Sequence, residues 1–189
     1  MTQTAVEFAI KDQSEFHKDL GVALGAEGKF AEAEQSFREA IRQRPDNSEA
    51  IYGRGLALYA QGLYEAATQA FREAIRQKLD YAEAYYGYAL ALAAQHWYGL
   101  ATEEFRKAIR LKPRYEWAHF HLGRILAKQA RYEDAIVEFR EALRIDPKFS
   151  WAEAELRDAI REMRNSATEK RDQRALSRTP SFAVGGAAN

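Results

Sequence analysis

The sequence repeats itself at a step of 34 residues, and no other feature constrains the fold as strongly. The segments QSFREAIRQ, QAFREAIRQ, EEFRKAIRL and VEFREALRI lie one step apart, and each has a phenylalanine at its third position. Other apolar positions return at the same step, such as Leu24, Leu58, Leu92 and Leu126, or Ala33, Ala67, Ala101 and Ala135. Self-similarity at a fixed period of this length indicates stacked structural repeats.

Within each repeat the apolar residues follow helical spacing in two blocks. In the second repeat the first block includes Ile51 and Leu58. The second block includes Phe71 and Ala74, and Gly62 lies between the two blocks. Steps of three and four residues mark one face of an α-helix, and proline between repeats ends a helix. Such prolines are Pro45, Pro113 and Pro147. Each repeat is therefore predicted to be a helix–turn–helix.

These residues resemble the tetratricopeptide repeat family. The matching positions of the first unit are His17, Leu20, Gly21, Gly28, Phe30, Ala33, Phe37, Ala40 and Pro45. The resemblance implies an all-α, right-handed solenoid of four units. Their expected bounds are 14–47, 48–81, 82–115 and 116–149.

The two ends of the chain carry different patterns. Residues 150–164 have helical spacing, and Ser150 and Glu153 are spaced as a capping box, so we expect a capping helix there. Residues 165–189 have no sustained periodicity and are predicted to be a disordered tail. Residues 1–13 form an N-terminal extension in which apolar residues alternate as in a strand, at Val6, Phe8 and Ile10.

Three positions depart from the family pattern. Leu79 stands where the other units have proline, so that boundary is expected to pack or bend differently. His96 and Ala130 stand where a glycine is usual, in the turn between the two helices. If these positions keep a positive φ, the alanine is strained by about 1 kcal/mol.

Composition and motifs argue against catalysis. The 28 basic and 28 acidic residues balance, which argues against a broadly basic surface for nucleic acid or membranes. Cysteine is absent, and no phosphate-binding glycine loop is found. His119 and His121 are two positions apart rather than four, and His17 and His119 occupy a packing position. We expect no enzyme activity, no cofactor and no metal site.

The expected cellular location is based on two kinds of segment that the sequence lacks. No apolar run approaches the roughly 20 residues of a membrane-spanning helix. The first residues lack a basic segment followed by an apolar one. A cytoplasmic protein is expected.

The resemblance implies that the first helix of each unit lines a concave groove. The first unit contributes a mixed set there: Glu15, Lys18, Asp19 and Val22. Further along, the set is mostly aromatic and aliphatic, which is typical of protein interfaces. The predicted peptide-binding groove consists of Tyr52, Gly53, Leu56, Tyr59, Tyr86, Gly87, Leu90, Trp117, Phe120, His121, Arg124 and Trp151.

Two glycines within this set allow two interpretations. Glycine inside a helix costs roughly 1 kcal/mol relative to alanine. Gly53 and Gly87 occupy the same position of successive units, each after a groove tyrosine. They either let a bound segment approach the backbone or let two helices pack more tightly.

The leading functional hypothesis is a non-catalytic adaptor that binds an apolar or aromatic peptide segment of a partner protein. The alternative is a self-associating scaffold whose groove is filled by its own chain or by another copy. The candidate fillers are Phe8 with Ile10 and Phe182 with Val184. Residues 164–189 carry five bases and two acids, a net charge of +3.

Two narrower functions are disfavoured. RNA binding needs a basic track along the groove, but Glu49 and Glu83 lie at its centre. The family's co-chaperone members hold acidic tails with a two-carboxylate clamp. The corresponding positions here are Lys18, Val22, Gly53, Glu83 and Gly87, of which only the lysine matches. The chain is therefore not expected to be a carboxylate-clamp co-chaperone.

Overall fold

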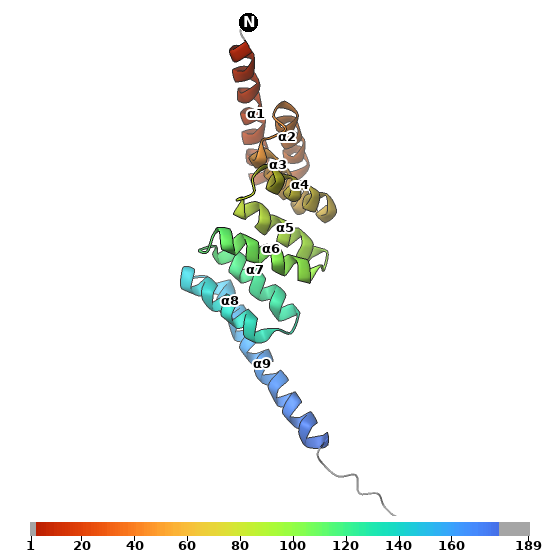
Figure 1. Cartoon of the computed structure of the whole chain (residues 1–189), viewed down its shortest axis with the longest axis vertical. Coiled ribbons are helices and arrows are strands. Elements are labelled where there is room, and N and C mark those ends of the chain that lie inside the picture. Colours follow the sequence, from red (N-terminus) through yellow and green to blue (C-terminus); the bar gives the residue numbers. More distant parts are fainter. Residues whose placement is uncertain (1–2, 178–189) are drawn as a thin grey trace, which may run out of the picture.

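The computed structural model describes residues 3–177, and within that range it consists of nine α-helices and no strand (Figure 1). The helices are α1 (Gln3–Ala26), α2 (Phe30–Gln43), α3 (Ser48–Ala60), α4 (Tyr64–Gln77), α5 (Ala82–Ala94), α6 (Tyr98–Leu111), α7 (Glu116–Lys128), α8 (Tyr132–Ile145) and α9 (Ser150–Ser177). Among these residues, no helix combines the length and the hydrophobicity needed to cross a membrane.

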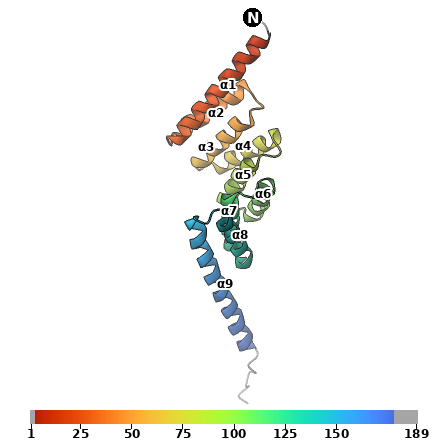
Figure 2. The same cartoon turned by 90° about the vertical axis from the view of Figure 1, so that its left-hand side faces the viewer.

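Each helix packs against the next one in the chain, so the helices form a row of antiparallel pairs. The first helices of successive pairs, α1, α3, α5, α7 and α9, also contact one another. We call the surface that they share the inner face. The result is an elongated solenoid with α1 at one end and α9 at the other (Figure 1, Figure 2). The predicted all-α solenoid of four repeats and a C-terminal helix is confirmed.

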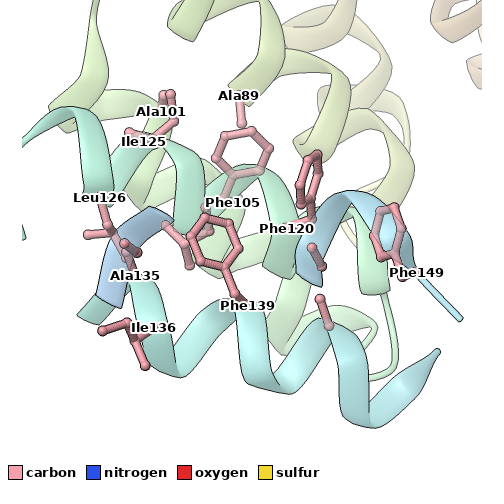
Figure 3. Packing of buried hydrophobic residues seen from close by; sticks show 14 of the residues in the cluster. Ala89, Ala101, Phe105, Phe120, Ile125, Leu126, Ala135, Ile136, Phe139 and Phe149 are labelled. Atoms are coloured by element: carbon pink, nitrogen blue, oxygen red, sulfur yellow. The ribbon is translucent and has the colours of Figure 1, made fainter. Parts of the chain in front are cut away.

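The recurring phenylalanines form the centre of each unit. Phe71, Phe105 and Phe139 are fully buried, and Phe37 is 4% exposed. Two alanines that recur in every unit are also fully buried, which lets the paired helices approach closely. They are Ala33, Ala67, Ala101 and Ala135, and Ala40, Ala74, Ala108 and Ala142. Figure 3 shows Phe105 and Phe139 within the largest cluster. Burying one such ring contributes about 1.5–3 kcal/mol. Because the rings recur every 34 residues, all of them are buried together only when each unit packs on the next in this one register.

All four helix–turn–helix turns adopt a positive φ at the same position. The angle is 78° at Gly28 and 76° at Gly62, where glycine accepts it readily. It is 64° at His96 and 57° at Ala130. The N–H of Ala130 donates to the carbonyl of Ala127 at 2.9 Å, as that of Gly62 does to Tyr59. The turn geometry is therefore retained although the glycine is missing, and Ala130 adopts a strained conformation.

At the boundary without a proline, the helix ends with the same backbone conformation as at its neighbours. Lys78 ends α4 with φ −142° and ψ 100°, close to the −136° and 95° of Arg44 at the end of α2. Leu79 is 74% exposed and is not needed for packing. The expectation that this boundary would differ was wrong for the helix end, because an extended residue after the helix is enough to end it. The loop itself differs: the N–H of Ala82 donates to the carbonyl of Asp80 at 3.1 Å, whereas after α2 the N–H of Asn47 donates to the carbonyl of Arg44.

Both terminal segments are more helical than the sequence indicated. Residues 3–13 belong to α1, so the strand-like alternation of the N-terminal extension was misleading. Helix α9 continues to Ser177, which overturns the predicted disorder of 165–177 and the end of the capping helix at residue 164. The rest of the predicted tail, 178–189, lies outside the described residues. Helix α9 therefore projects beyond the pairs that it caps (Figure 1).

Candidate interaction groove

The inner face contains a hollow of about 720 Å³ between α1 and α3. We call it the N-terminal groove. Its lining residues on the first helices and the adjoining loop are Lys18, Asp19, Gly21, Val22, Gly25, Ala26, Glu49, Tyr52, Gly53, Leu56, Ala57, Tyr59, Ala60 and Tyr81. Volumes of roughly 300–1,000 Å³ are typical of ligand sites. Four of the predicted groove residues line it, namely Tyr52, Gly53, Leu56 and Tyr59.

The walls of the N-terminal groove are apolar and open to solvent. Val22 from α1 is 59% exposed and Leu56 from α3 is 42% exposed. Neither side chain belongs to the buried core of its unit. Apolar side chains grouped around a hollow and not needed for packing are typical of an interaction site.

The mouth of the N-terminal groove carries an excess of carboxylates. The Lys18 ammonium pairs with Glu15, with Glu49 at 3.3 Å and with Asp19 at 3.6 Å. Its hydrogen bond to Glu15 raises the pKa of Lys18, against the opposing effect of burial. Arg44 also pairs with Glu15, at 3.2 Å. Arg44 pairs with Asp46 as well, at 3.6 Å, so four carboxylates face two cations in this cluster. The side chains of Asp19 and Glu49 are 74% and 66% exposed.

In units two to four, three rings pack together beneath the inner face. In unit two, the ring of Tyr52 lies 5.1 Å from that of Tyr81 in the following loop and 5.7 Å from that of Phe71 in α4. The same arrangement recurs with Tyr86, Tyr115 and Phe105, and with Phe120, Phe149 and Phe139. We call each set a ring triad. Each triad joins a first helix to the second helix and the closing loop of its own unit.

The ring triads hide part of the predicted groove. Phe120 is only 2% exposed and lies with Phe139 in the core (Figure 3). Tyr86 is half-buried, and burial raises its pKa well above the usual range. Burial likewise raises the pKa of Tyr52 to about 12, so these phenols stay neutral at ordinary pH. The prediction that Tyr52, Tyr86 and Phe120 are free to bind a peptide overlooked that these rings also pack in the core.

The two helical glycines are explained by packing. A Cβ at Gly53 would lie 2.5 Å from the ring of Phe37, and one at Gly87 would lie 2.6 Å from the ring of Phe71. Both glycines are buried. They let a first helix pack on the phenylalanine of the preceding unit, which supports the helix-packing interpretation over an opening for a ligand.

The other predicted residues lie towards α9 and are only partly available. Trp117 and Trp151 are 40% and 66% exposed. A hollow of about 330 Å³ lies beside Trp151. Arg124 forms an ion pair with Glu155 of α9 at 3.2 Å. Leu90, on α5 between the two ends, is half-buried.

His121 and His119 are both held by packing. The ring of His121 is stacked between Phe105 and Trp117, at 6.2 and 6.1 Å, and burial lowers its pKa to about 4. His119 contacts the Glu138 carboxylate at 2.7 Å and the Pro113 carbonyl at 3.2 Å, so both ring nitrogens have partners. Burial acts to lower the pKa of His119, but the hydrogen bonds to Glu138 and Pro113 and the nearby carboxylate charges together outweigh it, and the pKa is raised.

Sequence reasoning underrated two contributions to the N-terminal groove. The first unit supplies Lys18, Asp19 and Val22, which its mixed composition had made unremarkable. Tyr81 was not predicted at all, although a ring returns one step later at Tyr115 and again at Phe149. That recurrence was the available signal.

The sequence comparisons agree with this architecture. Family models described as tetratricopeptide repeat match residues 18–78, 82–115 and 117–149. The chain belongs to the tetratricopeptide repeat family, a class of helical-repeat proteins. A search of the curated proteins gives no match.

Solved structures resemble the fold at low sequence identity. PilF of Pseudomonas aeruginosa superposes with a TM-score of 0.76 at 18% identity, covering 96% of this chain and 80% of that one. A MamA structure gives 0.68 at 21% identity, covering 89% and 97%. YrrB, described as a TPR protein with an unusual peptide-binding site, gives 0.65 at 19% identity, covering 79% and 77%. These likenesses establish the fold.

Proposed function

We propose that this chain is a non-catalytic protein-interaction module whose N-terminal groove binds an apolar peptide segment of a partner protein. One observation carries the proposal: an open hollow of about 720 Å³ is walled by Val22 and Leu56, whose exposed side chains the core does not use. Binding a peptide there would remove apolar surface from water, at about 25 cal/mol per Å². The fold likeness to YrrB, a protein with a peptide-binding site, supports the same function.

The charges at the mouth indicate what should flank the apolar residues of the peptide. Asp19 and Glu49 extend into solvent, and the carboxylates there outnumber the cations. A lysine or arginine beside the apolar anchors would balance this excess, whereas an acidic flank would be repelled. We therefore expect an apolar segment with an adjacent basic residue.

A peptide-display selection with the full chain tests this function. The selected peptides should be apolar with a basic flank. The variant Leu56→Glu should weaken their binding about tenfold or more, because it places a charge in the apolar wall. Val137→Glu is the matched control, since Val137 is also apolar and exposed, at 62%, but lies on α8.

Two results decide the outcome of the selection. Circular dichroism must show equal helicity for the two variants, so that a loss of binding reports on the groove. Selected peptides that bind Leu56→Glu as tightly as the unaltered chain would contradict the proposed site.

A further inference from the structure

We propose that the N-terminal groove of one copy binds residues 178–184 of a second copy, so that the chain self-associates through its own C-terminal segment. This inference rests on the proposed function of the groove and names one occupant for it. The segment reads Arg-Thr-Pro-Ser-Phe-Ala-Val and begins directly after Ser177, the last described residue.

The direction of α9 prevents the segment from filling a groove of its own chain. An extended chain spans at most about 3.6 Å per residue, so Phe182 lies within about 18 Å of Ser177. Helix α9 rises about 1.5 Å per residue, which places Ser177 about 33 Å from Glu155. Glu155 pairs with Arg124 at the α9 end of the inner face, and the N-terminal groove lies further away still, near α1 (Figure 1). Occupation within one chain is therefore out of reach.

The segment has the chemistry that the groove walls require. Phe182 and Val184 are two positions apart, so in an extended chain both side chains point to the same side. Pro180 disfavours a helix just before them. An extended segment can then direct the two apolar side chains towards Val22 and Leu56, which line the groove from α1 and α3.

Charge complementarity favours the same occupant. The cluster at the groove mouth has four carboxylates against two cations, and Asp19 and Glu49 are well exposed. Residues 164–189 carry five bases against two acids, and Arg178 lies four positions before Phe182. Because exposed charges are screened over about 8–10 Å, added salt should weaken the association.

A complementation experiment with full-length chains tests the proposal. Light scattering of the unaltered chain should give a mass that rises with concentration above the monomer mass of 21.6 kDa. Phe182→Asp should remove this rise because it spoils the segment, and Leu56→Glu should remove it because it spoils the groove. Mixing the two variants should restore a 1:1 complex, since one supplies an intact groove and the other an intact segment. Val137→Glu should associate like the unaltered chain.

Several results would overturn the proposal. These are a chain that stays monomeric at every concentration, association that survives Phe182→Asp, and a mixture that stays monomeric. Association that is lost with Phe16→Asp but kept with Phe182→Asp would place the contact on α1, where Phe16 is 63% exposed, and would equally reject the segment. The peptide selection separates the two proposals, because peptide binding at Leu56 without self-association rejects only this one.

Discussion

Unit one and the three units that follow share a backbone but close their inner faces with different chemistry. Units two to four have a ring triad, whereas unit one has Lys18 and Asn47 at the positions of the first-helix ring and the loop ring. There, Asn47 donates to Ser14 Oγ at 3.2 Å, and Ser14 donates to the Ala40 carbonyl at 3.0 Å. In unit one, hydrogen bonds thus join the first helix, the second helix and the closing loop, which ring packing joins in the other units.

This difference explains where the inner face is open. In units three and four, the rings of Tyr86 and Trp117 both contact the ring of His121, so rings fill the space between α5 and α7. Between α1 and α3, the Lys18 side chain turns to its carboxylates and leaves the apolar hollow uncovered. We infer that binding capacity is greatest beside unit one because its ring triad is missing.

The largest expected effect is on the free energy of unfolding, and it should differ between two residues at the same repeat position, Phe120 in unit four and Lys18 in unit one. Phe120→Ala should lower the free energy of unfolding by about 3–5 kcal/mol, because it leaves a cavity in the core. Lys18→Ala should cost about 1 kcal/mol or less, because its ion pairs are partly exposed. Urea unfolding followed by circular dichroism measures both. Equal losses of unfolding free energy in the two variants would contradict the difference that we describe between the two units.

The next effect is a pH dependence from His121. Its pKa in the folded chain is lowered to about 4 by burial, whereas the unfolded value is near 6.5. The neutral ring is thus favoured by folding, and this stability is lost as the pH falls from about 6.5 towards 4, by about 3 kcal/mol. Unfolding at pH 7 and pH 4.5 should show a smaller loss in His121→Phe than in the unaltered chain. An identical loss in both would contradict the burial of this ring.

Glycine substitutions sharpen the packing comparison. Gly53→Ala should cost about 1–3 kcal/mol, because its Cβ meets the ring of Phe37. Gly25→Ala is the control, since a Cβ there meets no atom within 4 Å, and it should stabilise by about 0.5–1 kcal/mol. Thermal unfolding checks both. A neutral Gly53→Ala that loses only peptide binding would restore the ligand-approach interpretation.

The smallest effect concerns the turns. Ala130→Gly should stabilise the chain by about 1 kcal/mol, because it removes the strain at a φ of 57°. The reverse change in unit two, Gly62→Ala, should destabilise it by a similar amount at a φ of 76°. Denaturant midpoints of the two variants should move in opposite directions, and a shift in the same direction would contradict the strain argument.

The sequence predicted the fold far better than it predicted the groove. The phenylalanines and alanines that recur every 34 residues are core residues. Because they can all be buried in only one register, they determine how the helices pack. The ends of α1 and α9 were missed because a helix that projects from the stack has no apolar stripe to reveal it. The rings were assigned to the groove because the family resemblance implies which positions of the first helix face it. The resemblance did not indicate the loop ring, such as Tyr81, that covers such a side chain.

The position of a bound peptide tests the central claim most directly. Adding a selected peptide to the ¹⁵N-labelled full chain should shift the amide signals of Val22 and Leu56. It should leave the indole signals of Trp117 and Trp151 unchanged, since these residues belong to α7 and α9. Both helices lie far from α1 along the solenoid (Figure 1). Shifts confined to the two tryptophans would contradict the account, because they would place binding where the ring triads are complete.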